Sequence, residues 1–342
     1  MYRALNGWRF IFALMIVWHH MPVIKPHGAN FGNPIVTFFF VLSGFLLTLA
    51  YREKLLSGIV SPKEFVIKRS ATIFPLQWLF TLLFLLFSIN VVTYWAAPFH
   101  LTLIHSLVPF WEINFTLNTP SWFLSSLFIC YLFTPILFKF TERKLVFVLM
   151  FLGCVLSYHV FLYFLPESIG RRWLCYINPL ARLQDYGAGI LLALYWKDIE
   201  IRIRKVVKGN RFVATLLELL AICLMCISLF NIPILGLNRI LGVGSVLLVF
   251  FICIFISVFC LGIGVVSQCL SNQICDKLGK TAIAIFMSHG FILYYTEPLL
   301  KQSCLLYIVV TYMVIISFSI LLESYYCVWT KQWFQNILYN KK

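Results

Sequence analysis

Charged side chains are scarce in this chain, and acidic ones are the scarcest. Charged residues make up 11% of the 342, whereas a soluble domain carries about a quarter. There are 12 Asp and Glu against 27 Lys and Arg, while hydrophobic residues reach 61%. So few charges cannot solvate the surface of a soluble domain of this length. The composition therefore predicts an integral membrane protein.

Alternation of polar and apolar residues is also missing, which excludes a membrane β-barrel. Apolar segments instead run continuously, as in FICIFISVF, and many approach the roughly 20 residues that span a bilayer core as a helix. We therefore expect an all-α protein with about ten transmembrane helices. The expected spans are 9–24, 34–50, 73–93, 120–138, 144–165, 178–196, 212–231, 240–264, 279–298 and 304–329.

The segment 94–119 contains no Lys or Arg, as a translocated loop should. An even number of spans puts both termini on one side, and that side then holds 21 of the 27 basic residues. The positive-inside rule therefore predicts that both termini are cytoplasmic. Residues 1–20 resemble a signal peptide, but no small-residue cleavage site follows, so we expect a retained first helix.

No disulfide framework, internal repeat or low-complexity tract is evident. The eleven cysteines lie mostly inside apolar runs, where packing is their ordinary role. The net charge of +15 comes from basic residues dispersed between apolar spans, so we expect no nucleic-acid partner. The stretch 239–268, with four glycines, fits either one tilted helix or a broken one. We expect a single polytopic domain over residues 1–342, with no appended soluble domain.

Arg9 and His20 are ionisable residues inside the first span, where each is costly and so a functional hypothesis. Eleven residues of α-helix bring them to about 20° from full register, with a rise of about 16 Å. Both therefore project from one face of the span. The alternative is that Arg9 anchors the helix end by snorkelling and that His20 is an interfacial residue. Spacing alone does not separate these two interpretations.

Basic and aromatic residues mark the ends of two other spans. Lys68 and Arg69 precede the apolar part of the third span, where basic residues ordinarily anchor topology. Asn118 and Trp122 lie at the outer end of the fourth span, where Trp is most often part of the aromatic belt. Each set is thus a candidate site with an ordinary structural alternative.

Four further ionisable residues lie inside predicted spans. Arg182 and Asp185 are one turn apart and are expected to neutralise each other. His289 lies near the middle of the ninth span, where a structural histidine is at least as well supported as a catalytic one. Glu218 is expected to reach water at the cytoplasmic end of its span.

Six motifs occur in order between residue 5 and about 330. They are LNGWR followed by His20, PIVTFFFVLSGFLLT, FVIKRSATIFPLQW, TPSWFLSSLFICYLFTP, NPLARLQDYGAG and LGKTAIAIFMSH. Together they resemble the membrane-bound acyltransferase family 3, which O-acylates sugars and other acceptors at bacterial surfaces. The chain departs from the family pattern in three places. Thr72 occupies the position of the second Arg in the family's Arg-x-x-Arg motif. Ser126 occupies a position that is often acidic in the fourth-span motif, and Thr281-Ala282 replaces the common Ser-Tyr of the ninth span.

The resemblance implies transfer of an acyl group to a hydroxyl of a surface polysaccharide or lipid-linked glycan at the bacterial inner membrane. The implied donor is acetyl-CoA, and no metal is implied. His20 is implied as the general base, or less well as a transient acyl carrier. Arg9 is implied to hold the thioester end of the donor or to stabilise the developing oxyanion.

The resemblance also suggests where each substrate meets the protein. Arg69, with Lys68, would meet the CoA phosphates on the cytoplasmic side. Trp122 and Asn118 would contact the sugar on the outer side. Two rival functions remain: a glycan flippase, which would predict paired inverted repeats, and a non-catalytic scaffold, which would tolerate His20→Ala.

Overall fold

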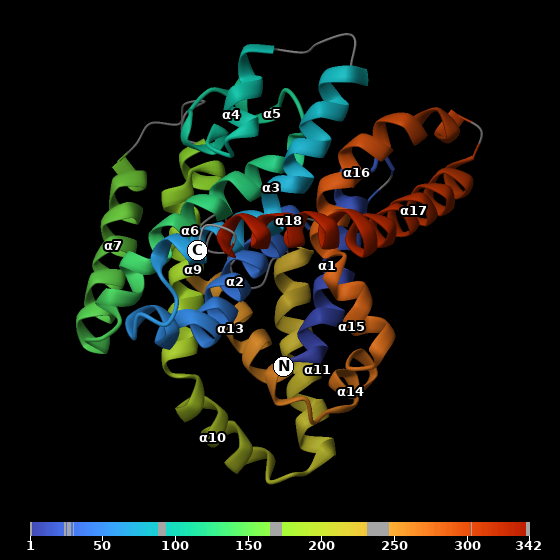
Figure 1. Cartoon of the computed structure of the whole chain (residues 1–342). Helices are drawn as coiled ribbons and strands as arrows, with labels where there is room; N and C mark the ends of the chain where they lie inside the picture. The colour runs from blue at the N-terminus through green and yellow to red at the C-terminus, as the bar shows by residue number, and fades with distance from the viewer. Residues whose placement is uncertain are drawn as a thin grey trace. The chain divides into compact units, whose positions relative to one another are not determined.

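A computed structural model of the chain describes residues 2–23, 25, 29, 31–87, 94–164, 173–230, 246–301 and 303–339 (Figure 1). Every regular element among these residues is helical, and each of the ten predicted spans overlaps a helix. Six helices in the described ranges are long and apolar enough to cross a membrane. The all-α, multi-pass prediction is confirmed. The number ten and the cytoplasmic placement of the termini stay predictions.

The helices form two compact units. The first comprises Met1–Arg9, Pro26–Val60 and Phe133–Gly279, and the second comprises Phe10–Lys25, Ser61–Leu132 and Lys280–Lys342. Whether residues 1–342 act as one domain stays a prediction. The long helix α1 (Arg3–His20) contributes its first turns to the first unit and the rest to the second.

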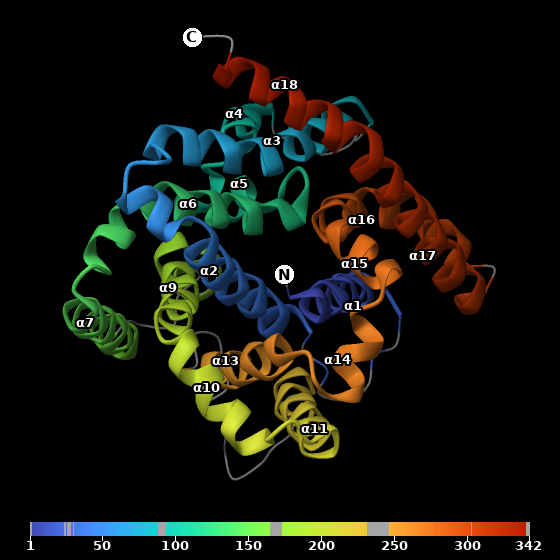
Figure 2. The same ribbon diagram turned by 60° about the horizontal axis from the view of Figure 1, so that its bottom comes forward.

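The first unit is built on close packing of α2 (Gly32–Leu56) against α9 (Pro179–Leu194), which lie side by side in Figure 2. A Cβ added at Gly44 would lie 2.1 Å from the Tyr186 carbonyl oxygen, and one at Gly189 would lie 2.0 Å from the Val41 carbonyl oxygen. Only glycine allows two backbones to approach this closely. The glycine of the FVLSG motif is therefore a packing residue. The other helices of this unit are α7 (Lys144–Phe164), α10 (Trp196–Val207), α11 (Arg211–Leu229), α13 (Val246–Leu261), α14 (Val265–Leu270) and α15 (Gln273–Lys280).

The described part of 239–268 is a broken helix. Helix α13 ends at Leu261, and Gly262 has φ +68°, a left-handed conformation that glycine adopts readily. Helix α14 follows, and the Glu218 carboxylate accepts hydrogen bonds from the Val266 and Ser267 amides at its start. The expectation that Glu218 reaches water is wrong. Its side chain is buried because it satisfies amides that α14 itself leaves unpaired. Gly242 and Gly244 lie outside the described residues.

The core of the second unit joins the last turns of α1 to α16 (Ala282–Thr296) and α17 (Cys304–Leu321) (Figure 2). Their apolar side chains form one buried cluster: Ala13, Val17, Met21, Ala282, Ile285, Ile292, Leu293, Tyr307 and Ile315. A π-helical turn at Leu322–Tyr326 connects α17 to α18 (Cys327–Tyr339), which packs against α3 (Pro62–Phe87) (Figure 1). Helix α6 (Trp122–Phe140) begins in this unit.

Helix α3 begins eleven residues before the predicted span at 73–93, because the prediction depends on apolar residues and the first turns of the helix are polar. The Ser61 hydroxyl accepts a hydrogen bond from the Glu64 amide at 3.1 Å, and Pro62 is the first helical residue. Both are ordinary features of a helix start. A charged helical extension thus precedes the apolar part of the span.

The predicted loop 94–119 is folded onto α3. It contains short helical turns at Tyr94–Ala96, Ala97–Leu101, His105–Leu107 and Trp111–Phe115, followed by Thr119–Ser121. The Gln77 side-chain amide donates to the His100 carbonyl at 3.1 Å, and the Trp78 indole donates to the Leu101 carbonyl at 2.9 Å. We call residues 94–121 the cap segment.

Candidate active site

His20 is the last residue of α1, and its ring is held by the turn that precedes it. The Nδ1 atom lies 2.9 Å from the Ile16 carbonyl oxygen. A carbonyl only accepts hydrogen bonds, so these partners assign the proton to Nδ1 and leave a lone pair on Nε2. The His20 side chain is exposed. It therefore has the tautomer and the accessibility that a general base needs.

His289 of α16 is the side-chain partner of His20. The His289 Nε2 lies 3.3 Å from His20 Nδ1, and the two ring centroids are 4.9 Å apart. The His289 Nδ1 lies 3.3 Å from the Ile285 carbonyl, which places a proton there and leaves Nε2 as an acceptor toward His20. The His289 side chain is fully buried, at 0% exposure.

Asn118 braces the backbone of α16 next to His289. Its side-chain amide donates to the Met287 carbonyl at 3.0 Å, and its Oδ1 faces Gly290, where a Cβ would lie only 3.3 Å away. Asn118 is fully buried. The structure thus brings three residues, His20, His289 and Asn118, into one neighbourhood of the second unit.

Trp122 is also buried, with 6% of its side chain exposed, at the start of α6. The next residue, Phe123, packs on Phe286 with ring centroids 4.8 Å apart. The structure places Trp122 within a packed helix start, whereas stacking on a sugar ring requires an open face.

Arg9 lies in the first turns of α1, within the first unit. Its Nη1 donates to the Asn6 side-chain oxygen at 3.2 Å, and the Asn6 amide donates to Asp276 of α15 at 2.8 Å. Asn6 thereby links the guanidinium to a carboxylate. The spacing of Arg9 and His20 along one continuous helix is as expected.

Lys68 and Arg69 lie on the N-terminal half of α3. The Lys68 ammonium pairs with Glu64 at 2.6 Å, four residues earlier, so its charge is balanced within the helix. Thr72, at the position of the second family arginine, donates its hydroxyl to the Arg69 carbonyl at 2.6 Å.

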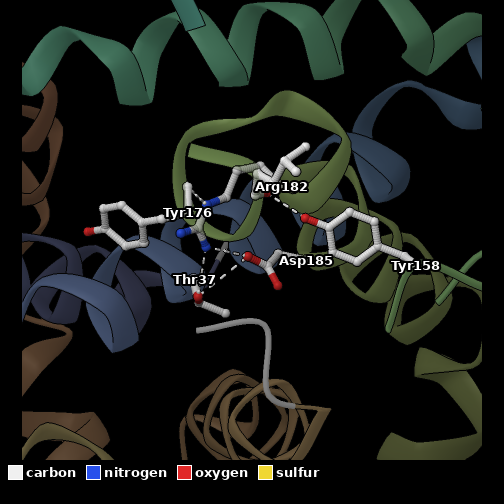
Figure 3. A network of polar contacts seen from close by, with 6 residues as sticks. Thr37, Tyr158, Tyr176, Arg182 and Asp185 are labelled. Atoms are coloured by element: carbon white, nitrogen blue, oxygen red, sulfur yellow. Dashed lines mark hydrogen bonds and ion pairs between the residues drawn. The ribbon is translucent and has the colours of Figure 1, made fainter. Parts of the chain in front are cut away.

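A buried ion pair within α9 is hydrogen-bonded to α2 through Thr37 in the first unit (Figure 3). The Arg182 guanidinium donates to Asp185 at 2.8 Å and to the Thr37 hydroxyl at 3.3 Å, and its Nε donates to the Tyr176 carbonyl at 2.7 Å. The prediction that Arg182 and Asp185 neutralise each other is confirmed. Tyr158 of α7 donates its hydroxyl to the Leu174 carbonyl beside this network.

A second histidine pair lies in the cap segment. The rings of His100 and His105 stack face to face, 4.0 Å apart and inclined by 9°, and both are fully buried. The His100 Nε2 donates to the Ile113 carbonyl at 2.7 Å, so its Nδ1 accepts from the Ser121 hydroxyl at 3.3 Å. Ser121 then accepts from His105 Nε2 at 3.2 Å. Burial lowers the pKa of His100 to about 4 and that of His105 well below its ordinary value.

Two features of the site were missed by sequence reasoning. The contact of His289 with His20 joins positions 269 residues apart, and the only signal for it was the histidine that ends the late motif. The stacking of His100 on His105 depends on the turns of the cap segment. Nothing in the spacing of these residues indicates it.

No group of three or more His, Cys, Asp or Glu side chains in the described ranges is arranged to hold a metal ion. The side chains that the described site brings together are the imidazoles of His20 and His289 and the amide of Asn118. Acid–base chemistry on oxygen is what such groups support.

Comparison with known proteins locates this site within a family. A family model described as an acyltransferase domain, the acyltransferase family 3 model, matches residues 2–324. "Protein 2 in picA locus" of Rhizobium radiobacter is 32% identical over 124 residues, which is 36% of this chain. The aligned part is 64% of the length of that relative. No solved structure matches the chain. The match over residues 2–324 shows that the chain belongs to the membrane-bound acyltransferase family 3.

Proposed function

We propose that the protein transfers an acetyl group from cytoplasmic acetyl-CoA across the bacterial inner membrane to a hydroxyl of a surface or lipid-linked saccharide. The observation that carries the proposal is His20, an exposed imidazole whose Nδ1 proton is fixed and whose Nε2 has a lone pair. Membership of an acyltransferase family supports acyl transfer as the reaction. The donor, the acetyl group and the saccharide are parts of the proposal.

In the proposed reaction His20 Nε2 takes the proton of the acceptor hydroxyl as its oxygen bonds to the thioester carbonyl carbon. Collapse of the tetrahedral intermediate breaks the carbon–sulfur bond, and the proton passes from His20 to the CoA thiolate. Imidazole suits both steps because its ordinary pKa lies near neutral pH.

Arg9 is assigned to the donor. Eleven residues of helix separate its Cα from that of His20 by about 16 Å along α1, too far for a direct contact with an oxyanion beside His20. With cytoplasmic termini, Arg9 lies on the side from which acetyl-CoA arrives. Arg69, with Lys68 paired to Glu64, would meet the CoA phosphates on that same side.

Asn118 and Trp122 are assigned to the acceptor side. Asn118 donates to the backbone of α16 next to His289, and His289 contacts the proposed base. Both residues are buried. They would therefore shape the wall of the sugar site and would not stack on the sugar ring.

The test is made in the native host. The gene is deleted, and the strain is complemented with wild type or with His20→Ala. The acetyl content of the surface glycan is then measured by proton NMR, with membrane insertion checked by blotting. We expect acetyl signals with wild type and none with His20→Ala or the deletion. Unchanged acetylation in all three strains would exclude the proposed function, and the flippase and scaffold interpretations would remain.

A further inference from the structure

His289 is the buried neighbour of His20, and we propose that it is a positioning residue that holds the base in one tautomer. The inference rests on the proposed function, because it assigns a role within the same site. His289 presents Nε2 to His20 and directs its other nitrogen, Nδ1, to the Ile285 carbonyl, and this arrangement assigns the proton to Nδ1.

Two acceptors converge on one atom of His20. The Ile16 carbonyl lies 2.9 Å and His289 Nε2 lies 3.3 Å from His20 Nδ1. In the other tautomer Nδ1 would carry a lone pair, which would face these two acceptors without any proton between them. The contact is partly buried, so each lost hydrogen bond is costly, and the two acceptors select Nδ1–H and leave Nε2 for the substrate.

The hydrogen bond from His20 to His289 becomes stronger during the reaction. When His20 takes the hydroxyl proton it becomes an imidazolium, and its Nδ1–H becomes a charge-assisted donor to His289. His289 thus stabilises the charged form of the base, as the third member of a catalytic triad does. A neutral imidazole does this without placing a carboxylate in the membrane, where a charge is expensive.

The proton remains on His20 and does not travel onward through His289. The far nitrogen of His289 faces the Ile285 carbonyl at 3.3 Å, and a carbonyl is a poor site for a proton. His289 therefore orients His20 and stabilises its charged form, and the proton passes from His20 to the leaving thiolate.

The surroundings of His289 keep its ring in place. The Phe286 ring centroid lies 5.7 Å from that of His289, and Phe123 packs on Phe286. Asn118 holds the α16 backbone at Met287, two residues before the histidine. A ring without these supports would lose its alignment with His20, so Asn118 acts on the base through His289.

The test compares His289→Gln, which retains an acceptor oxygen, with His289→Phe, which keeps a ring but has none. Purified protein is assayed for CoA release from acetyl-CoA, with surface glycan from the deletion strain as acceptor. We expect His289→Phe to lose 10-fold or more in kcat with little change in KM for acetyl-CoA. The acidic limb of its kcat profile should move to lower pH, because the imidazolium has lost an acceptor. His289→Gln should recover most of the loss.

Nitrogen-15 solid-state NMR on histidine-labelled protein gives a readout that a purely structural role would not move. Wild type and His289→Gln should show His20 protonated at Nδ1, and His289→Phe should show a mixture of tautomers. His100→Phe is the control for loss of a buried histidine in the same unit, and it should lower thermal stability without moving the pH profile.

Two outcomes separate this inference from the proposed function. If His20→Ala is inactive while His289→Phe keeps the wild-type kcat and pH profile, the positioning role is wrong and the proposed function stands. If His20→Ala acylates the glycan at the wild-type rate, the proposed function itself fails. Equal losses in His289→Gln and His289→Phe, with His20 protonated at Nδ1 in both, would also overturn the positioning role.

Discussion

The second unit contains two histidine pairs with opposite arrangements. His20 and His289 meet through ring nitrogens, 3.3 Å apart, and His20 is exposed. His100 and His105 stack face to face at 4.0 Å, and neither is accessible. The first pair leaves a nitrogen lone pair on the exposed ring of His20. In the second pair, His100 Nδ1 and His105 Nε2 both bond to the Ser121 hydroxyl.

This difference shows that residue type alone does not identify a catalytic histidine. Both pairs include a hydrogen bond from a ring nitrogen to a backbone carbonyl. Only the first pair combines a fixed tautomer with access to a substrate. We therefore assign chemistry to His20 and His289 and structure to His100 and His105.

The largest expected effects are opposite for the two pairs: a variant of His20 should lose activity, and a variant of His105 should lose stability. His20→Ala should lower the acylation rate about 10²–10⁴-fold, the usual contribution of a general base, with a near-normal unfolding midpoint. His105→Phe should lower the unfolding midpoint and leave the rate per folded molecule close to wild type. The two quantities are measured by CoA release and by thermal unfolding in detergent. A large rate loss in folded His105→Phe would remove the distinction between the pairs.

Ser121→Ala should cost stability alone. It removes the hydroxyl that lies between His100 Nδ1 and His105 Nε2, and both nitrogens are then left unpaired in a buried site. Each unsatisfied group costs about 1–3 kcal/mol. Denaturant or thermal unfolding measures the loss. Ser157→Ala, a change of the same kind on α7 where the hydroxyl bonds only within its own helix, is the control and should change stability little. Equal stability of the two variants would contradict the bridging role.

Acid should loosen the cap segment. Burial lowers the pKa of His100 to about 4 and that of His105 well below its ordinary value, against about 6.5 in an unfolded chain. The unfolded segment therefore binds protons as pH falls below about 6.5, while the folded one stays neutral. Stability is complete above pH 6.5 and declines as the pH falls toward 4.

Hydrogen exchange, corrected for the intrinsic effect of pH, measures this directly. Peptides covering 94–121 should lose protection between pH 7.5 and 5, and peptides of α13, which has no histidine or acidic residue, should not. The double variant His100→Phe/His105→Phe should show no such dependence. Protection that is constant with pH in the wild-type cap segment would mean that the histidines are not held neutral by burial.

The smallest expected effect is that of Gly290→Ala. A Cβ at this position would lie 3.3 Å from Asn118 Oδ1 and from Pro120 Cδ, so both must shift by a few tenths of an ångström. We expect a few-fold loss of acylation through displacement of the Asn118 brace. Gly153→Ala on α7 is the matched control, because a Cβ there has open space and should slightly stabilise the helix. Equal activity of both variants would show that Asn118 does not brace α16 in a way that matters for catalysis.

Much of the fold follows from the sequence, because long apolar runs must form helices in a membrane. The Arg182–Asp185 pair was also predictable, since spacing of one turn brings the side chains together. The early start of α3 was missed because its first turns are polar, although Ser61, Pro62 and Glu64 form a recognisable helix start. The burial of Glu218 was missed because its partners lie about 50 residues away, beyond a broken helix.

The candidate site was predictable only in part. Arg9 and His20 are related by helical spacing on one element, so the sequence alone predicts that they share a helix face. The contact of His20 with His289 depends on packing of α1 against α16, through side chains such as Ala13 and Ile285. No local pattern carries that information.

The central claim is that the imidazole of His20 is the base, and chemical rescue tests it most directly. His20 ends α1, a position where glycine is well tolerated, so His20→Gly should fold. The measurement is the rate of acetyl transfer from acetyl-CoA to glycan from the deletion strain by this variant, with and without added imidazole. The account predicts little transfer without imidazole and a rate that rises with its concentration. Wild-type transfer by His20→Gly in the absence of imidazole would contradict it.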